Sequence, residues 1–302
     1  MSETTATLER QLESARDLQS VVRTMKALAA SSIGQYEQSV LALGDYYRTV
    51  ELGLGVCLRA GVTSVNVDHQ NPVTAATRVG VIVFGSDQGL VGQFNEIAAQ
   101  SALQTLPELA GRVQVWAVGD RVHGRLEDAG VRITGRFSLP TSALGVSAFV
   151  SQLLLETQTS STAGDPGELH VLYNRTAAGS TYEPVVRRIL PLDREWVLQL
   201  AGEPWPGESL PEVLGDQTAT LRALIGEYVF ISLFRACMES LASENAARLA
   251  AMQRADKNID DLTETLNGTF HRLRQSSIDE ELFDVISGVE ALSATDAHAI
   301  KE

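Results

Sequence analysis

The stretch LERQLESARDLQSVVRTMKALAASSIGQYEQSVLALGDYYRTVELGL, residues 8–54, decides the fold, because apolar residues recur along it at alternating intervals of four and three. The positions at this spacing form a first seam: Leu8, Leu12, Ala15, Gln19, Val22, Lys26, Ala29, Ile33, Tyr36, Val40, Leu43, Tyr47, Val50 and Leu54. Only Gln19 and Lys26 are polar. A straight helix drifts off a strict heptad by about 20° per repeat, so this spacing predicts a coiled coil. The N-terminal helix is expected within residues 1–60, and from residue 8 to Ala60 it would extend roughly 80 Å.

The other end of the chain has the same character. No proline follows Pro211, and apolar residues again share one stripe. This second seam contains Leu224, Tyr228, Ile231, Met238, Ala242, Leu249, Met252, Ile259, Leu266, Phe270 and Leu273, interrupted by Arg235, Asn245, Asp256 and Thr263. A continuous helix from Asp216 to about Leu292 would reach on the order of 110 Å, so the region 216–302 is predicted to be a second long helix.

The region between the two helices alternates strand and helix patterns. Compact β-branched runs predict strands at 78–84, 112–118 and 168–173, with an edge strand at 185–190, and helical spacing occurs at 93–106, 120–129 and 142–157. Such alternation indicates a Rossmann-like, mainly parallel α/β domain over residues 77–195. Residues 61–76 and 202–215 are the expected hinges. Because these connections are short, we expect the two long helices to form an antiparallel coiled coil.

Composition excludes several classes of function. The formal net charge is −14 and the chain has only three lysines, which disfavours binding to nucleic acid. Cys57 and Cys237 are far apart and lack neighbouring ligands, so they are predicted to be buried apolar residues. The N-terminus does not resemble a signal peptide, and no apolar run approaches the roughly 18 residues that would span a bilayer.

Motifs for catalysis are scarce. The loop from Gly85 to Gly92 lies between a predicted strand and a predicted helix, but its glycines do not have the GxGxxG spacing of a dinucleotide site. We interpret it as a tight turn that needs the φ freedom of glycine. The sequence has no GxxxxGK[ST] phosphate loop, and its histidines show no ligand spacing. We therefore expect no catalytic residues, no cofactor and no metal.

Four short segments carry a resemblance to a known family. They are VRTMKALAAS (22–31), SDQGLVGQFN (86–95), SENAARLAAM (243–252) and, further on, DKN (256–258) with RQSSIDEEL (274–282). In this order they resemble the TxxMxxVAAS, SDRGLCGGxN, SEQAARMxAM, DN and RQxxITxEL segments of gamma subunits of F-type ATP synthases. Because the matches are spread over the whole chain, chance similarity is a poor explanation.

The resemblance implies a non-catalytic central-stalk rotor that couples ion translocation through a membrane ring to ATP synthesis or hydrolysis in a catalytic head. Its implied partners are the alpha and beta head subunits, the epsilon subunit and the c-ring. The implied location is the cytoplasmic side of a bacterial or archaeal membrane, where the chain is peripheral. By the family's pattern, the contacts to the catalytic subunits are Met25, Lys26, Arg248, Arg274 and Gln275.

Departures from the family pattern indicate a divergent branch. Ser32 stands where a lysine usually follows the AAS segment, Gln88 replaces the arginine of the middle loop, and Asp279 replaces a threonine. The coupling ion, H⁺ or Na⁺, is chosen by other subunits. Two alternatives from other classes stay open: a coiled-coil adaptor that bridges unrelated partners, and a Rossmann-like nucleotide-binding enzyme.

Overall fold

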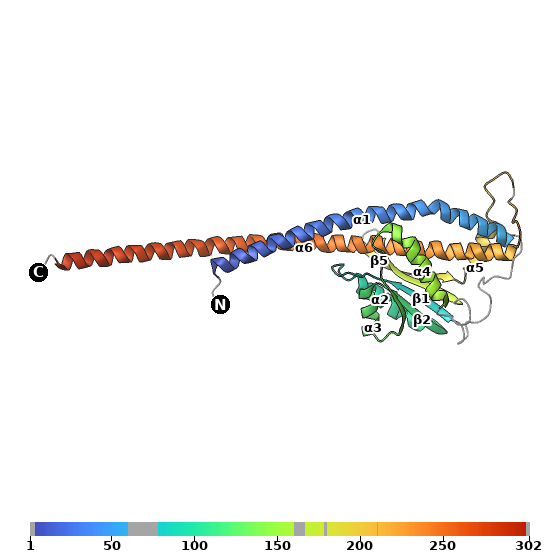
Figure 1. The fold of residues 1–302 in the computed structure, drawn as a ribbon, viewed down its shortest axis with the longest axis horizontal. Helices are drawn as coiled ribbons and strands as arrows, with labels where there is room; N and C mark the ends of the chain where they lie inside the picture. Colours follow the sequence, from blue (N-terminus) through green and yellow to red (C-terminus); the bar gives the residue numbers. More distant parts are fainter. Residues whose placement is uncertain (1–3, 60–77, 160–166, 178–179, 210, 300–302) are drawn as a thin grey trace. The chain divides into compact units, whose positions relative to one another are not determined.

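The computed structural model describes residues 4–59, 78–159, 167–177, 180–209 and 211–299 (Figure 1). In the sequence, one very long helix precedes an α/β region and another follows it: α1 spans Thr5–Arg59 and α6 spans Gln217–Ala299. The expected hinge at 61–76 lies outside the described residues. None of the described helices is both long enough and apolar enough to cross a membrane.

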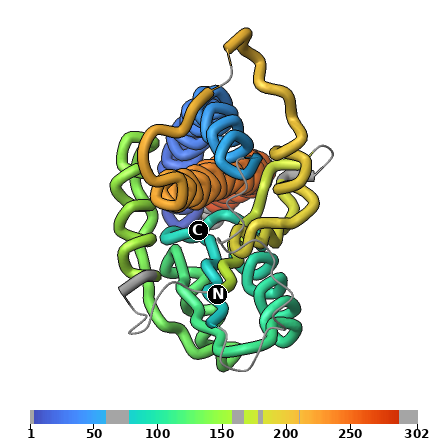
Figure 2. Tube along the Cα trace, turned by 90° about the vertical axis from the view of Figure 1, so that its right-hand side faces the viewer, coloured from blue at the N-terminus to red at the C-terminus, as the bar shows by residue number. Residues whose placement is uncertain are grey.

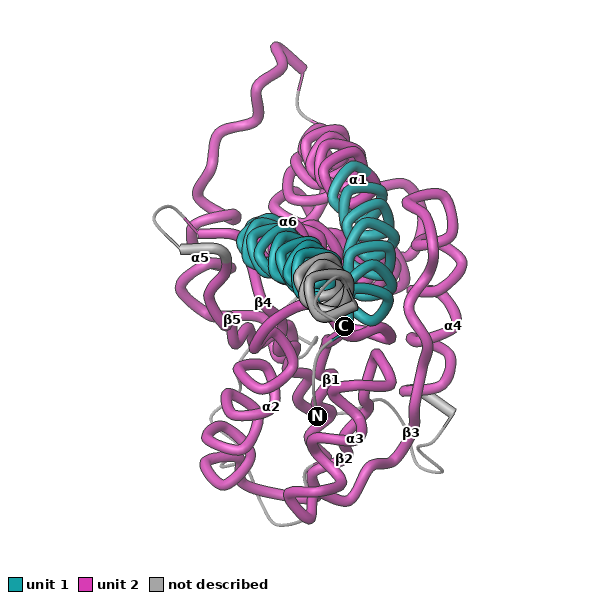
Figure 3. The backbone as a smooth tube through the Cα atoms, turned by 90° about the vertical axis from the view of Figure 1, so that its left-hand side faces the viewer, with its two compact units in different colours: residues 1–27, 252–302 teal, residues 28–251 magenta. Residues whose placement is uncertain are grey.

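The chain divides into two compact units (Figure 3). Unit 1 combines Met1–Ala27 with Met252–Glu302, and therefore holds the first part of α1 and the last part of α6. Unit 2 is Leu28–Ala251 and holds the rest of both helices together with the sheet. Each unit is described by itself.

Both units contain an antiparallel pairing of α1 with α6. In unit 1 the Gln19 amide donates to Asp260, whereas Lys26, further along α1, bonds Asp256, which comes earlier in α6. In unit 2 the ring centroids of Tyr47 and Tyr228 are 6.2 Å apart, whereas Gly53, further along α1, lies against Leu224, which comes earlier in α6. The predicted two-helix pairing is confirmed.

The seams are the contact faces of these helices. Every described position of the first seam is buried or half-buried, and so is every apolar position of the second seam. Cys57 and Cys237 are free and buried, as predicted. The polar interruptions differ among themselves: Arg235 is exposed, whereas Asn245 is buried and donates its side-chain amide to the carbonyl of Leu241 at 2.8 Å.

The sheet of unit 2 has the strand order β3-β2-β1-β4-β5. The strands are β1 (Arg78–Phe84), β2 (Arg112–Val118), β3 (Ile133–Phe137), β4 (Glu168–Ala177) and β5 (Ser180–Leu190). All neighbouring pairs are parallel except β4 with β5, which run antiparallel. The mainly parallel α/β fold and its edge strand at 185–190 are confirmed, although β3 was not predicted and β5 begins earlier than expected.

Helices cover both faces of the sheet. One core cluster joins Ile82, Trp116 and Val171 to α4 (Val146–Thr159) and α6, whereas a second joins Val81 and Val115 to α2 (Phe94–Thr105) and α3 (Asp120–Asp128). Alternate residues of a strand point to opposite faces, so β1, β2 and β4 contribute to both clusters. Figure 2 traces α2 and α4 on different sides of this domain. A short helix, α5 (Arg194–Gly202), precedes α6.

Candidate functional site

In unit 1 the polar interruptions of the two seams contact each other. Lys26 Nζ lies 2.7 Å from Oδ2 of Asp256, and Nε of Arg23 lies 3.4 Å from Oδ1 of the same carboxylate. The hydrogen bond from Lys26 is the main reason that the pKa of Asp256 is lowered, and the positive charges of Lys26 and Arg23 act in the same direction. A polar pair placed in an apolar seam fixes the register of two helices.

A second apolar face of α1 is left uncovered. Leu18 and Val21 are 59% and 57% exposed, and Met25 follows at the next helical step with a half-buried side chain. The spacing of three and then four residues places the three side chains on one face of the helix. Met25, predicted to contact a partner, therefore belongs to an apolar strip that the sequence interpretation had not noticed in full.

Arg274 and Gln275, also predicted partner contacts, are exposed on α6 in unit 1. They are followed by a tip stripe of exposed apolar residues: Ile278, Leu282, Phe283, Val285 and Ile286. Ile278, Leu282 and Val285 are 56%, 57% and 64% exposed. The sequence interpretation missed this stripe, although apolar residues at helical spacing beyond the last seam position were a usable signal.

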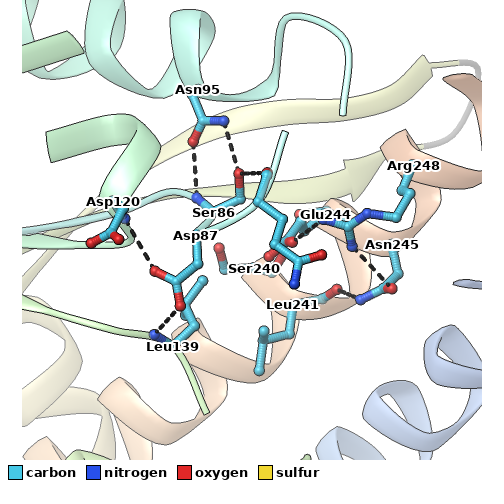
Figure 4. A network of polar contacts seen from close by, with 12 residues as sticks. Ser86, Asp87, Asn95, Asp120, Leu139, Ser240, Leu241, Glu244, Asn245 and Arg248 are labelled. Atoms are coloured by element: carbon cyan, nitrogen blue, oxygen red, sulfur yellow. Dashed lines mark hydrogen bonds and ion pairs between the residues drawn. The ribbon is translucent and has the colours of Figure 1, made fainter. Parts of the chain in front are cut away.

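In unit 2 the glycine-rich loop is held closed by its own side chains. Oδ1 of Asn95 accepts from the backbone N–H of Ser86 at 2.9 Å, and Nδ2 of Asn95 donates to the Ser86 hydroxyl at 2.8 Å. The Asp87 carboxylate accepts from the N–H groups of Asp120 at 3.1 Å and of Leu139 at 2.9 Å. Figure 4 shows these bonds around the loop. Asp87 thereby ties the loop to the start of α3 and to the segment after β3.

The reason for glycine in this loop differs in part from the sequence interpretation. Gly92 has φ +62°, as a residue chosen for backbone freedom would, and Leu90 shares that region with φ +63°. At Gly85 the requirement is space, because an added Cβ would lie 2.3 Å from Cβ of Val122. The attribution of Gly85 to φ freedom was therefore wrong.

This loop is poorly suited to a phosphate. The Ser86 and Asp120 N–H groups are already used by Asn95 and Asp87, and the Asp87 carboxylate would repel an anion. Within the described ranges, no group of three or more His, Cys, Asp or Glu side chains is arranged to hold a metal ion. The expectation that the chain binds neither ATP nor NAD stays a prediction.

Close to the loop, α6 carries a buried ion pair. Nη2 of Arg248 lies 2.6 Å from Oε1 of Glu244, and Nη1 of Arg248 lies 3.4 Å from Oδ1 of Asn245 (Figure 4). Burial raises the pKa of Glu244, the charge and hydrogen bond of Arg248 oppose this, and the negative charge of Asp87 adds to the increase. Arg248, predicted to contact a catalytic subunit, is thus engaged inside unit 2.

The predicted contact residues fall into two groups. Met25, Lys26, Arg274 and Gln275 belong to unit 1, where Lys26 is paired and the other three lie on partly or fully exposed surface. Arg248 belongs to unit 2 and lies between the glycine-rich loop and the apolar core of α6. The structure therefore offers one long helical surface in unit 1 and one internal polar network in unit 2.

Comparison with known proteins finds a family and relatives that match nearly the whole chain. The model of the ATP synthase family matches residues 4–292. The chain is 29% identical to the ATP synthase gamma chain of Frankia casuarinae over 94% of this chain and 96% of that one. It is 28% identical to the ATP synthase gamma chain of Clavibacter sepedonicus over the same shares of the two chains.

Solved structures share the fold. A chain of the mitochondrial ATP synthase of Euglena gracilis, in a structure of its OSCP/F1/c-ring in rotational state 3, has a TM-score of 0.65 and 18% identity. That match covers 97% of this chain and 95% of the other. A chain from the central stalk and c-ring of the Tetrahymena thermophila mitochondrial ATP synthase has a TM-score of 0.54 and 16% identity, and covers 78% of this chain and 99% of its own.

Proposed function

The chain belongs to the ATP synthase gamma chain family, and we propose that it acts as the non-catalytic, central-stalk rotor subunit of an F-type ATP synthase. The observation that carries the proposal is that the family match runs over residues 4–292, and so includes both long helices and the domain inserted between them. The match therefore includes both the helices that we assign to the rotor shaft and the domain that we assign to the contact with the membrane ring.

The uncovered apolar residues of unit 1 support a partner around the helices. Monomeric proteins rarely leave contiguous apolar surface in water, and exposed patches commonly mark interaction sites. Leu18 and Val21 on α1 and the tip stripe on α6 are such residues. We assign them, with Met25, to the surface that turns inside the ring of alpha and beta subunits.

Polar contacts to the same ring come from the remaining predicted residues. Arg274 and Gln275 are exposed and offer several donors to carboxylates or carbonyls of the beta subunits. Lys26 keeps two of its three N–H donors for a partner while the third bonds Asp256. The Arg248 guanidinium bonds Glu244 and Asn245 and its side chain is 12% exposed, so we assign its contact in the assembled complex to this small exposed part.

Rotation of an asymmetric helix pair explains the coupling. The side of α1 with Leu18 and Val21 is apolar, whereas Asp260 and Asp261 make the nearby surface of α6 acidic. As the helix pair turns, each catalytic site therefore faces an apolar surface at one angle and an acidic surface at another. At each angle the catalytic subunit favours the conformation that binds the facing surface best. Three sites in a ring then change state in sequence without any chemistry in this chain.

The α/β domain of unit 2 is assigned to the base of the rotor, against the c-ring and the epsilon subunit. The complex then holds this chain peripherally at a bacterial or archaeal membrane, on its cytoplasmic side. Either H⁺ or Na⁺ is compatible with this role, because the ion binds to other subunits.

Co-purification tests the proposal. The tagged full chain, expressed with the alpha, beta and epsilon subunits of its own organism, is expected to form a complex that hydrolyses ATP, with its components identified by mass. Recovery of assorted unrelated proteins would instead support an adaptor. Micromolar binding of ATP or NAD by the chain alone would support the nucleotide-binding alternative.

A further inference from the structure

Two buried polar side chains of unit 2 link β4, the start of α2 and α6. Asn174, on β4, is fully buried, and its Nδ2 donates to the carbonyl of Phe94 at 2.8 Å. The backbone carbonyl of Asn174 in turn accepts from the hydroxyl of Ser243 on α6 at 2.6 Å. Ser243 is also fully buried. Two hydrogen bonds therefore connect the start of α2 through β4 to α6.

The hydrogen bonds among Phe94, Asn174 and Ser243 lie in surroundings that exclude water. Val91, Phe94 and Ala247 form a small buried cluster beside them, and the ring of Tyr182 packs edge-on against Phe94 with centroids 5.3 Å apart. In such surroundings a hydrogen bond is stronger than in water, and a lost partner is not replaced by solvent. Among the described residues Oδ1 of Asn174 has no hydrogen-bond partner, and the bond to the Phe94 carbonyl orients the amide of this side chain.

Apolar packing alone does not fix how α6 lies on the sheet. The large core cluster joins Val171 and Tyr173 of β4 to Met238 and Leu241 of α6, but apolar attraction is not directional. A hydrogen bond weakens steeply when its geometry changes. The bond from Ser243 to the Asn174 carbonyl, together with the bond from the Tyr173 hydroxyl to Glu239 at 2.8 Å, therefore favours one axial position and one rotation of the helix among those that bury similar apolar area.

We propose that Ser243, through its hydrogen bond to the backbone carbonyl of Asn174, is a positioning residue that locks the α/β domain to α6, so that the domain and the helix turn as one body. The inference rests on the proposed rotor function and adds the place at which torque passes between the two. Without the lock, part of each rotational step is lost as movement of the domain on the helix, and ion translocation is coupled less tightly to ATP hydrolysis.

The test uses Ser243→Ala in the complete complex reconstituted in vesicles. ATP hydrolysis is measured together with ATP-driven membrane potential, followed by a voltage-sensitive dye that responds equally to H⁺ or Na⁺. Loss of one neutral hydrogen bond shifts the ratio of two alternative arrangements by about fivefold. We expect hydrolysis to persist and the initial rate of potential formation per ATP hydrolysed to fall by about twofold or more.

Ser240→Ala is the matched control, because Ser240 is buried one turn earlier on α6 and its hydroxyl has no hydrogen-bond partner among the described residues. The variant keeps the Ser240 backbone carbonyl, which also accepts from the Ser243 hydroxyl at 3.0 Å. Asn174→Leu removes the side-chain bond to Phe94 but keeps the backbone carbonyl that accepts from Ser243, so it should leave coupling unchanged. Coupling in Ser243→Ala equal to that in Ser240→Ala would overturn the inference, even if Asn174→Leu does not fold. Failure of the unaltered chain to assemble with the head subunits would instead refute the rotor function.

Discussion

Nζ of Lys26 lies 2.7 Å from Oδ2 of Asp256, so a cation of α1 and a carboxylate of α6 meet at positions where each seam interrupts its apolar pattern. Because this pair is the largest cause of the lowered pKa of Asp256, its contribution to stability depends on pH. A carboxyl whose pKa is lower in the folded chain stabilises the fold above its ordinary pKa of 3.8, and this contribution disappears as pH falls through the lowered value.

Lys26→Met should therefore destabilise the isolated chain at neutral pH and have a vanishing effect in acid. The difference in denaturation midpoint between the original chain and the variant is expected to be constant from pH 7 to about 5 and to shrink below pH 3.8. Urea titrations at several pH values measure this. Lys257→Met removes the same charge from an exposed neighbour of Asp256 and serves as control. A difference that persists unchanged at pH 3 would contradict the ion pair as its source.

Asp87→Ala should destabilise unit 2 without altering its helix content. The carboxylate accepts from the exposed Asp120 N–H at the start of α3 and from the partly buried Leu139 N–H, and the loss of each such bond costs about 0.5–1.5 kcal/mol. We expect a loss of about 2 kcal/mol in the free energy of unfolding, measured by urea denaturation. Asp128→Ala, at the exposed end of the same helix, is the control and should change stability by less than about 0.5 kcal/mol.

The long helices and the sheet could be predicted because their signals are local and repeated. The heptad spacing from Leu8 to Leu54 and the runs at 78–84 and 112–118 correspond closely to α1, β1 and β2. β3 was missed because Ile133–Phe137 alternates half-buried with exposed residues at the sheet edge and contains Gly135, which weakens the strand pattern. The short α5 was missed for a similar reason, since nine residues carry little periodicity.

The polar networks could not be predicted, because they join residues that are distant in the chain. Asp256 was noted as an interruption of its seam and as part of the DKN segment, but its pairing with Lys26 was not predicted. Asn174 gave no signal in sequence, since an Asn in a strand is ordinary, and nothing in the sequence joined it to Ser243. The resemblance to gamma subunits had singled out the segments around Ser86 and Ser243, and the structure explains why both matter to unit 2: they are joined through Asn174.

Ile278→Ser combined with Leu282→Ser tests the tip stripe. Both residues are exposed in the isolated chain, so its stability should change by no more than about 0.5 kcal/mol. If the stripe is buried by the head subunits, loss of two large apolar side chains should weaken the affinity of the chain for the alpha–beta ring by about tenfold or more. Titration of labelled chain with the assembled ring measures this.

Leu144→Ser is the matched control for the tip stripe, because Leu144 is 94% exposed on the α/β domain and should not enter the ring. Its affinity is expected to equal that of the original chain. Equal affinity of the double variant and the control would show that the tip stripe is not part of the interface.

Arg274→Ala combined with Gln275→Ala should lower ATP turnover of the assembled complex while the isolated chain stays folded. Both residues lie just beyond Leu273, the last position of the second seam, and both are exposed. A charge-assisted hydrogen bond to a partner is worth about 1.5–3 kcal/mol. If that bond forms at one rotor angle only, its loss raises one barrier of the cycle, and about 1.4 kcal/mol already corresponds to a tenfold change in rate.

Arg272→Ala separates this contact from a general effect of charge. Arg272 is exposed two residues earlier on α6, where its guanidinium bonds the carbonyl of Gly268 and the hydroxyl of Thr269 on its own helix. The Arg272→Ala substitution removes one positive charge, as the double variant does, but from a side chain that already bonds to its own helix. Circular dichroism of the free chain and steady-state hydrolysis by the complex are measured for both. Normal helicity with a loss of turnover in the double variant but not in Arg272→Ala supports the contact. Turnover in the double variant equal to that of the original chain would mean that Arg274 and Gln275 are simply hydrated.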